Sequence, residues 1–129
     1  MKALVNSRRV LLFGFDPQEE SGLRHFFEGL RFTVFTESSD RAGCTVGALL
    51  RLSGFTRKDT FSDSCGPLIV FSGISGKELQ TAVSCLKRPD ILKASVTPSN
   101  QNWSISRLYL ALWEERAAFS KKAEFEQNA

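Results

Sequence analysis

The chain has 129 residues, of which 42% are hydrophobic and 24% are charged, and this length and composition are those of a single globular domain. Its 17 basic and 14 acidic residues are mixed along the sequence and give a net charge of +3, which argues against the concentrated basic patch of a nucleic-acid-binding protein. The longest apolar run, residues 10–15, is far too short to span a bilayer, so we expect no membrane association.

The cysteines indicate a reducing compartment. Cys44, Cys65 and Cys85 cannot all pair with one another, and none has the C-x-x-C or Cys/His spacing of a metal or redox site. We therefore expect free thiols in a cytoplasmic protein, with no metal and no cofactor.

Residues 1–55 predict a unit with the order strand, helix, strand, helix. Apolar runs indicate the strands, and apolar residues at spacings of three and four indicate the helices. Asp16 is placed to cap the first helix and Pro17 to occupy its first position, where a missing N–H costs nothing. The expected elements are a strand over residues 9–15, a helix from Pro17 to Leu30, a strand over residues 32–36 and a helix over residues 42–52.

Residues 67–120 follow the same order after a polar connecting loop over residues 56–66, and residues 121–129 are expected to form a frayed tail. An offset of 59 residues lays Gly73 on Gly14, so we interpret the two halves as an internal repeat. The expected elements are a strand over residues 67–74, a helix capped by Ser75, a strand over residues 92–97, and a long helix with Ile105, Leu108, Tyr109, Leu112 and Trp113 on one face.

The predicted fold is an α/β domain with a four-stranded, mostly parallel sheet of order 2-1-3-4 and helices on both faces. The first and third strands are almost continuously apolar, as strands covered on both faces must be, whereas the second and fourth alternate as edge strands do. A ferredoxin-like α+β fold with an antiparallel sheet of order 4-1-3-2 keeps the same two strands in the centre and is the alternative.

In an open parallel sheet, ligands bind at the carboxyl ends of the strands, where the strand order reverses. The turns predicted at that edge are rich in small, hydroxyl-bearing and amide-bearing residues. We therefore expect a binding site there, whereas an antiparallel sheet would divide these turns between two edges. The candidate site residues are Gly14, Asp16, Ser72, Gly73, Ser75, Thr97, Ser99 and Asn100.

The segment before the long helix also has a structural interpretation. Pro98 ends the preceding strand, and Ser104 is placed to cap the helix. Trp103 and Leu108 have the spacing of a hydrophobic staple, and Asn100 is placed to close an Asx turn. These roles explain the segment without a ligand, and we favour them as its first interpretation.

Signals for catalysis are weak throughout the sequence. His25 lies in the first helix beside two phenylalanines, and we expect a partly buried imidazole with a packing role. The turn over residues 72–77 lacks the spacing of a phosphate-binding loop. Cys44 is expected to be a small buried residue. A small enzyme that uses Glu19, Glu78 or Cys44 is the least favoured hypothesis, because no positioned base is evident.

Residues 68–118 carry an apolar strand, a Ser-Gly-Ile turn, a Glu-Leu helix and a Thr-Pro-Ser-Asn-x-x-Trp-Ser segment before a C-terminal helix. This pattern resembles an uncharacterised family of small bacterial proteins, known only as a domain of unknown function. It departs from the family at Arg107, where such proteins tend to carry an acidic residue three positions after the capping hydroxyl. The resemblance implies a bacterial source and no particular activity. The residues that carry it are Ser72, Gly73, Ile74, Glu78, Leu79, Thr97, Pro98, Ser99, Asn100, Trp103 and Ser104.

These observations favour a non-enzymatic cytoplasmic module that binds a small ligand or a partner protein at the edge formed by the Gly14, Gly73 and Thr97–Asn100 turns. The alternative is a homo-oligomeric assembly protein, in which the sheet or the long helix with Tyr109 and Trp113 packs against a second copy. Sedimentation at several protein concentrations distinguishes the two hypotheses.

Overall fold

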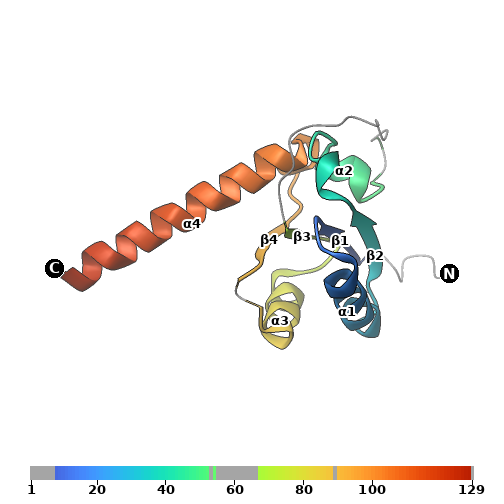
Figure 1. Ribbon diagram of the computed structural model, residues 1–129, viewed down its shortest axis with the longest axis horizontal. Coiled ribbons are helices and arrows are strands. Elements are labelled where there is room, and N and C mark those ends of the chain that lie inside the picture. The colour runs from blue at the N-terminus through green and yellow to red at the C-terminus, as the bar shows by residue number, and fades with distance from the viewer. Residues whose placement is uncertain (1–7, 53, 55–66, 89, 129) are drawn as a thin grey trace.

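The computed structural model describes residues 8–52, 54, 67–88 and 90–128, with the side chains described as far as residue 117 (Figure 1). The predicted connecting loop over residues 56–66 lies outside the described residues. The elements, in chain order, are β1 (Arg9–Phe13), α1 (Pro17–Gly29), β2 (Thr33–Glu37), the 3-10 helix η2 (Ser39–Arg41), α2 (Val46–Leu49), β3 (Leu68–Ser72), α3 (Gly76–Leu86), β4 (Leu92–Ser95), the 3-10 helix η3 (Asn100–Asn102) and α4 (Ile105–Asn128). Helix α4 thus continues through residues 121–128, where the sequence predicts a frayed tail.

The described strands form one sheet with the order β2-β1-β3-β4, which confirms the predicted order and the α/β class. Strands β1 and β2 are parallel, as are β3 and β4. The central pair is antiparallel, with Leu11 opposite Val70, so the sheet is mixed rather than parallel throughout. A central strand that is covered on both faces has the same apolar sequence in either direction, which is why the pattern of residues does not reveal this reversal.

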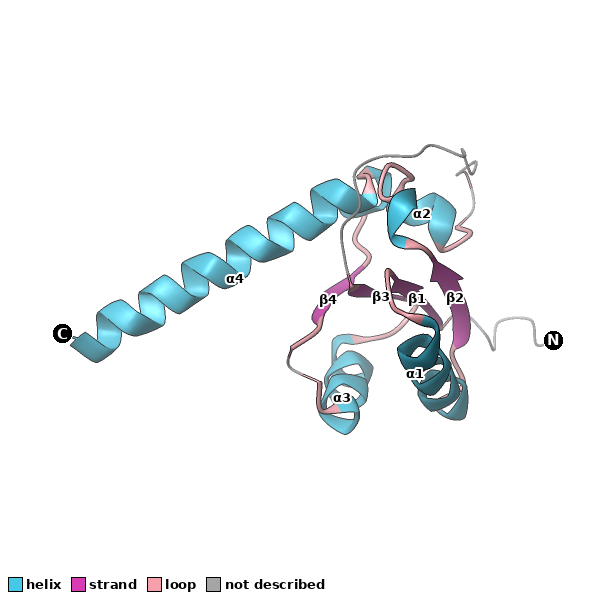
Figure 2. Ribbon diagram, in the orientation of Figure 1, coloured by secondary structure: helices cyan, strands magenta, loops and turns pink. Residues whose placement is uncertain are grey.

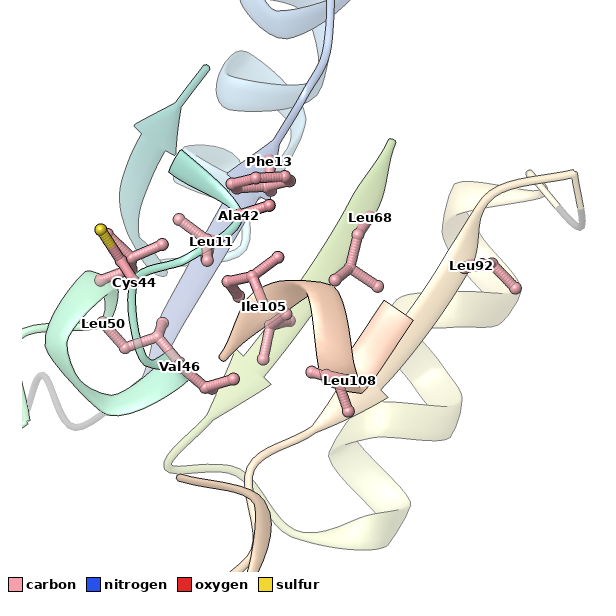
Figure 3. Packing of buried hydrophobic residues seen from close by; sticks show 12 residues of the cluster. Leu11, Phe13, Ala42, Cys44, Val46, Leu50, Leu68, Leu92, Ile105 and Leu108 are labelled. Atoms are coloured by element: carbon pink, nitrogen blue, oxygen red, sulfur yellow. The ribbon is translucent and has the colours of Figure 1, made fainter. Parts of the chain in front are cut away.

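Helices α1 and α3 cover one face of the sheet, and α2 and the first turns of α4 cover the other, so helices lie on both faces as predicted (Figure 2). Along β1, alternate side chains point to opposite faces and enter two separate apolar clusters. Val10 and Leu12 join the cluster beneath α1 and α3, which contains three phenylalanines in edge-to-face contact, Phe27, Phe32 and Phe71. The cluster beneath α2 and α4 is mainly aliphatic and is shown in Figure 3.

Equivalent positions of the two halves meet at the centre of the molecule. Leu11 pairs with Val70 in the sheet, and Thr45 forms an isolated antiparallel bridge with Ser104. Around that bridge, the Val46 N–H donates to the Trp103 carbonyl at 2.9 Å, and the Ile105 N–H donates to the Cys44 carbonyl at 3.0 Å. Positions 11 and 70, and positions 45 and 104, are each separated by 59 residues, which is the offset that aligns the two halves of the sequence.

Candidate binding groove

The antiparallel pairing of β1 and β3 divides the predicted site between two edges of the sheet. Phe13, the last residue of β1, lies opposite Leu68, the first residue of β3. Gly14 and Asp16 therefore follow β1 at one edge, while the predicted residues that follow β3 and β4 lie at the other. The prediction of one composite edge is wrong, because it depended on parallel central strands.

Six of the predicted residues remain at a common edge, but they belong to two groups. Ser72, Gly73 and Ser75 lead into α3, whose apolar residues pack on the face with the phenylalanines. Thr97, Ser99 and Asn100 lead into α4, whose first turns pack on the opposite face. Each group thus leads into its own helix, and the two helices pack on opposite faces of the sheet.

The predicted hydroxyl and carboxylate groups at the helix starts act as caps. The Asp16 carboxylate accepts a hydrogen bond from the Glu19 N–H at 2.8 Å, and the Ser75 hydroxyl accepts one from the Glu78 N–H at 3.2 Å. The Glu78 carboxylate in turn accepts from the Ser75 N–H at 3.1 Å, which completes a capping box. These hydrogen bonds give Asp16 and Ser75 a structural role.

Asn100 closes a turn, as the structural interpretation predicts. Its side-chain oxygen accepts from the Thr97 N–H at 2.8 Å, and its side-chain amide donates to the Ser95 carbonyl at 3.1 Å. The Asn100 N–H also donates to the Thr97 hydroxyl at 3.0 Å, and the residue is only 9% exposed. Its polar atoms therefore serve the fold rather than a ligand.

Arg107 makes two contacts at the start of α4. The Arg107 N–H donates to the capping hydroxyl of Ser104 at 3.2 Å, and the Arg107 guanidinium lies 4.3 Å from the centre of the Trp103 ring. A cation above the face of an indole ring is attracted by the quadrupole of the ring. Trp103 and Leu108 belong to the same apolar cluster, as a hydrophobic staple requires.

A groove of about 220 Å³ lies between the end of α1 and the start of α3. It opens at the edge of the sheet where β1 and β2 begin and β3 and β4 end. Of the lining residues, Glu78 was weighed as a catalytic group and Lys77 belongs to the turn that lacks the spacing of a phosphate-binding loop. The sequence did not predict this site, because Arg8, the end of α1 and the start of α3 are far apart in the chain. The lining residues are Arg8, Leu30, Phe32, Lys77, Glu78, Thr81 and Ala82.

The end of α1 fixes the aromatic floor of this groove. The Phe32 N–H donates to the Phe27 carbonyl and the Arg31 N–H donates to the Glu28 carbonyl, each at 3.0 Å. With Arg31 at a positive φ of 69°, these two bonds form a Schellman motif. The Phe32 ring then packs edge-to-face on Phe27 with the ring centres 5.5 Å apart, and Phe32 is only 7% exposed. The floor is therefore held by both backbone and ring contacts.

One rim of the groove is an ion pair that joins the two halves of the chain. Arg8 pairs with Glu78 and also donates to the Leu30 carbonyl at 3.2 Å. The pKa of Glu78 is lowered, first by the hydrogen bonds from the Ser75 N–H and hydroxyl and then by the charge of Arg8. Glu78 is therefore ionised at neutral pH, with one oxygen held by Ser75 and the other by Arg8.

Lys77 is the remaining charged group of the lining. Its side chain is exposed, and nothing in the described part of the chain pairs with its ammonium group. Thr81 donates its hydroxyl hydrogen to the Lys77 carbonyl at 3.0 Å, so that donor is already used. With Arg8 and Glu78 cancelling, the ionised lining residues have a net charge of +1.

Of the residues weighed for catalysis, Glu78 lines the groove, whereas His25, Cys44 and Glu19 do not. His25 is exposed, so the expectation of a partly buried imidazole is wrong; it occupies a helix position that faces solvent between Arg24 and Phe26. Cys44 is 3% exposed, as expected of a small buried residue. Glu19 pairs with Arg88 at 2.5 Å. Within the described ranges, no three of the His, Cys, Asp and Glu residues are grouped to hold a metal ion.

The described residues form an α/β domain with a mixed sheet and a groove between α1 and α3. No helix in the described part of the chain is long and apolar enough to cross a membrane. Residues 67–119 match the model of a family described as a domain of unknown function, DUF3783. This match confirms the resemblance to a domain of unknown function over β3, α3, β4 and the first part of α4. Neither the curated proteins nor the solved structures contain a match to the chain.

Proposed function

We propose that this protein is a non-enzymatic bacterial module of the cytoplasm that binds a small ligand in the groove between α1 and α3. The observation that carries the proposal is the combination of a fixed apolar floor, formed by Leu30, Phe32 and Ala82, with a charged rim. Small-molecule sites are concave and mostly apolar, with a few polar groups that orient the ligand.

The polar groups around the groove favour binding over catalysis. The Glu78 carboxyl has a lowered pKa and each of its oxygens accepts a hydrogen bond, so it is a weak base toward a proton of a substrate. The Thr81 hydroxyl donates within its own helix, to the Lys77 carbonyl. Lys77 is left to contact a ligand, through its charge.

The test is a thermal-shift screen of the purified protein against nucleotides, sugar phosphates and metabolite acids, because a compound that binds only the folded state raises the melting temperature. Each hit is repeated with Thr81→Phe, which places a ring over the groove. Gln80→Phe is the matched control, because it adds the same ring at an exposed position of α3 that does not line the groove.

We expect a hit whose shift is lost in Thr81→Phe and kept in Gln80→Phe. Shifts that survive in both variants would place the ligand elsewhere, and a panel that gives no shift with the unmodified protein would contradict the proposed function.

A second candidate function is self-association through α4. Leu110 is 59% exposed and Trp113 is 47% exposed, and they are the large apolar side chains left uncovered in the described ranges. Trp113 packs edge-to-face on Tyr109 with the ring centres 6.3 Å apart. Helix α4 then continues away from the sheet to Asn128 (Figure 1), and a helix that lacks a packing partner is marginally stable in water.

Sedimentation velocity over a hundredfold range of concentration tests this candidate. We expect a dimer that dissociates on dilution, and we expect the double variant Leu110→Gln, Trp113→Gln to remain monomeric. Glu114→Gln, at an exposed position of the same helix, is the control. A monomer at every concentration would rule out self-association through α4.

A further inference from the structure

We infer that the ligand of the groove is a carboxylate monoanion with a short apolar body. This inference rests on the proposed function, because it names the class of compound that the same groove takes. It is argued from the charge balance of the lining, the volume of the groove and the separation of its apolar and charged surfaces.

The charge balance favours one negative charge on the ligand. Arg8 and Glu78 neutralise each other, and the Glu78 carboxylate is further held by the capping box, so this pair has little tendency to reorganise around a ligand. Lys77 adds one positive charge that no group in the described ranges neutralises. A monoanion completes the balance, whereas a dianion leaves one charge without a partner in a partly desolvated site.

The volume favours a short body. A groove of about 220 Å³ is below the range of about 300–1,000 Å³ that accommodates drug-sized ligands. Taking about 30 Å³ for each water-sized atom, it holds roughly seven non-hydrogen atoms. A six-carbon acid fits this volume, if its carboxylate remains at the rim.

The lining separates the two ends of such a molecule. The floor consists of the Phe32 ring and the Ala82 methyl group, with Leu30 beside them, and offers no polar side chain. The free charge lies on α3, at Lys77, one helical turn before Thr81. An alkyl chain on the floor and a carboxylate beside the Lys77 ammonium group satisfy both surfaces at once. Burial of each CH₂ group on the floor removes apolar surface from water and so favours binding.

The test is an amide-resolved NMR titration of the full chain with hexanoate, acetate and the neutral hexanamide. We expect hexanoate to shift the amide signals of Phe32 and Ala82 and to bind more tightly than either of the other two probes. Lys77→Gln removes one positive charge at the rim, and we expect it to weaken hexanoate binding about two- to fivefold, as for an exposed ion pair.

Gln18→Glu is the matched control, because residue 18 is the position 59 residues before Lys77, is exposed on α1, and its substitution changes the total charge by the same amount. We expect it to leave hexanoate binding unchanged. If both variants weaken hexanoate binding equally, Lys77 acts only through the total charge of the protein, and the inference is overturned.

The probes separate this inference from the proposed function. If hexanamide binds at the groove as tightly as hexanoate, the carboxylate class is wrong and the groove is still a ligand site. If acetate binds as tightly as hexanoate, the apolar body is wrong. If no probe shifts the Phe32 and Ala82 signals, and the thermal-shift panel is also silent, both the inference and the proposed function fail.

Discussion

The starts of α1 and α3 are equivalent places in the two halves of the chain, and they share one device. Glu19 and Glu78, which are 59 residues apart, both lie three residues after the capping residue of their helix. Each pairs with an arginine from the other half, Arg88 with Glu19 and Arg8 with Glu78. The first turn of a helix is a favourable place for an anion, and in both α1 and α3 the glutamate at this place links the two halves through an ion pair.

The surroundings of the two links differ, and the difference is instructive. Arg88 is held by a second carboxylate, Asp90, at 3.0 Å, and the hydrogen bonds to Asp90 and Glu19 raise its pKa above the ordinary value of an arginine. Glu78 is instead held by a second set of donors, its capping box, and has Lys77 beside it. The two links therefore have different second partners, a carboxylate beside Arg88 and a capping box at Glu78, and only the second link lines the groove.

The largest expected effect is on the free energy of unfolding, at equivalent core positions of the two halves. Phe27 and Leu86 are equivalent positions, but Phe27 is fully buried among Phe26, Phe32 and Phe71, whereas Leu86 is half-buried. We expect Phe27→Ala to lower the free energy of unfolding by about 3–5 kcal/mol and Leu86→Ala by less than about 2 kcal/mol, measured by urea unfolding. Equal losses would show that the two helices contribute alike to the core.

A smaller loss is expected at Asn100, where the turn of the second half depends on three hydrogen bonds. Asn100→Ala removes two of these directly and leaves the Thr97 N–H and the Ser95 carbonyl without this partner. We expect a loss of about 1–3 kcal/mol in the same unfolding measurement. Asn102→Ala, at an exposed position of the same turn, is expected to stay within about 0.5 kcal/mol. An Asn100→Ala protein of unchanged stability that fails to bind a ligand would return Asn100 to the candidate site.

These residues also show what a sequence reveals of this fold and where it stops. The caps at Asp16, Ser75 and Ser104 and the turn at Asn100 were predictable, because each depends on neighbours within three to five positions. The strand order was predictable, because covered and edge strands differ in their apolar pattern. These features depend on local chemistry or on burial.

The direction of the central pair and the groove were not predictable, for a physical reason. A strand that is buried on both faces carries no mark of its direction. Arg8 and Glu78 are 70 positions apart, so their contact follows only from the folded topology. The position of Phe32 depends on a left-handed backbone at Arg31, and arginine does not signal such a conformation as glycine does.

We expect low pH to remove the contribution of Glu78 to the stability of the fold. The pKa of Glu78 in the folded protein is below its ordinary value of 4.5, so ionised Glu78 favours the folded state. This contribution is complete above pH 4.5 and is lost as the pH falls through the lower pKa of the folded state. We expect Glu78→Gln to lower the melting temperature at pH 7 and the difference from the unmodified protein to shrink steadily towards pH 2. A difference that is constant with pH would show that the charge of Glu78 does not stabilise the fold.

The smallest expected effect is a gain in the free energy of unfolding, from substitutions at the left-handed residues that follow α1 and α3. Arg31 follows α1 at a φ of 69° and Lys87 follows α3 at a φ of 55°, and both side chains are exposed. A left-handed backbone costs a residue with a Cβ atom roughly 1–2 kcal/mol, and glycine avoids this cost while losing more entropy on folding. We expect Arg31→Gly and Lys87→Gly each to raise the free energy of unfolding by about 0.5–1 kcal/mol. Arg31 is followed by Phe32, so Arg31→Gly also tests whether the floor of the groove tolerates a freer backbone. Unchanged amide signals for Phe32 would show that ring packing alone fixes the position of Phe32. Shifted signals with a gain in stability would show that the strained backbone sets the shape of the floor.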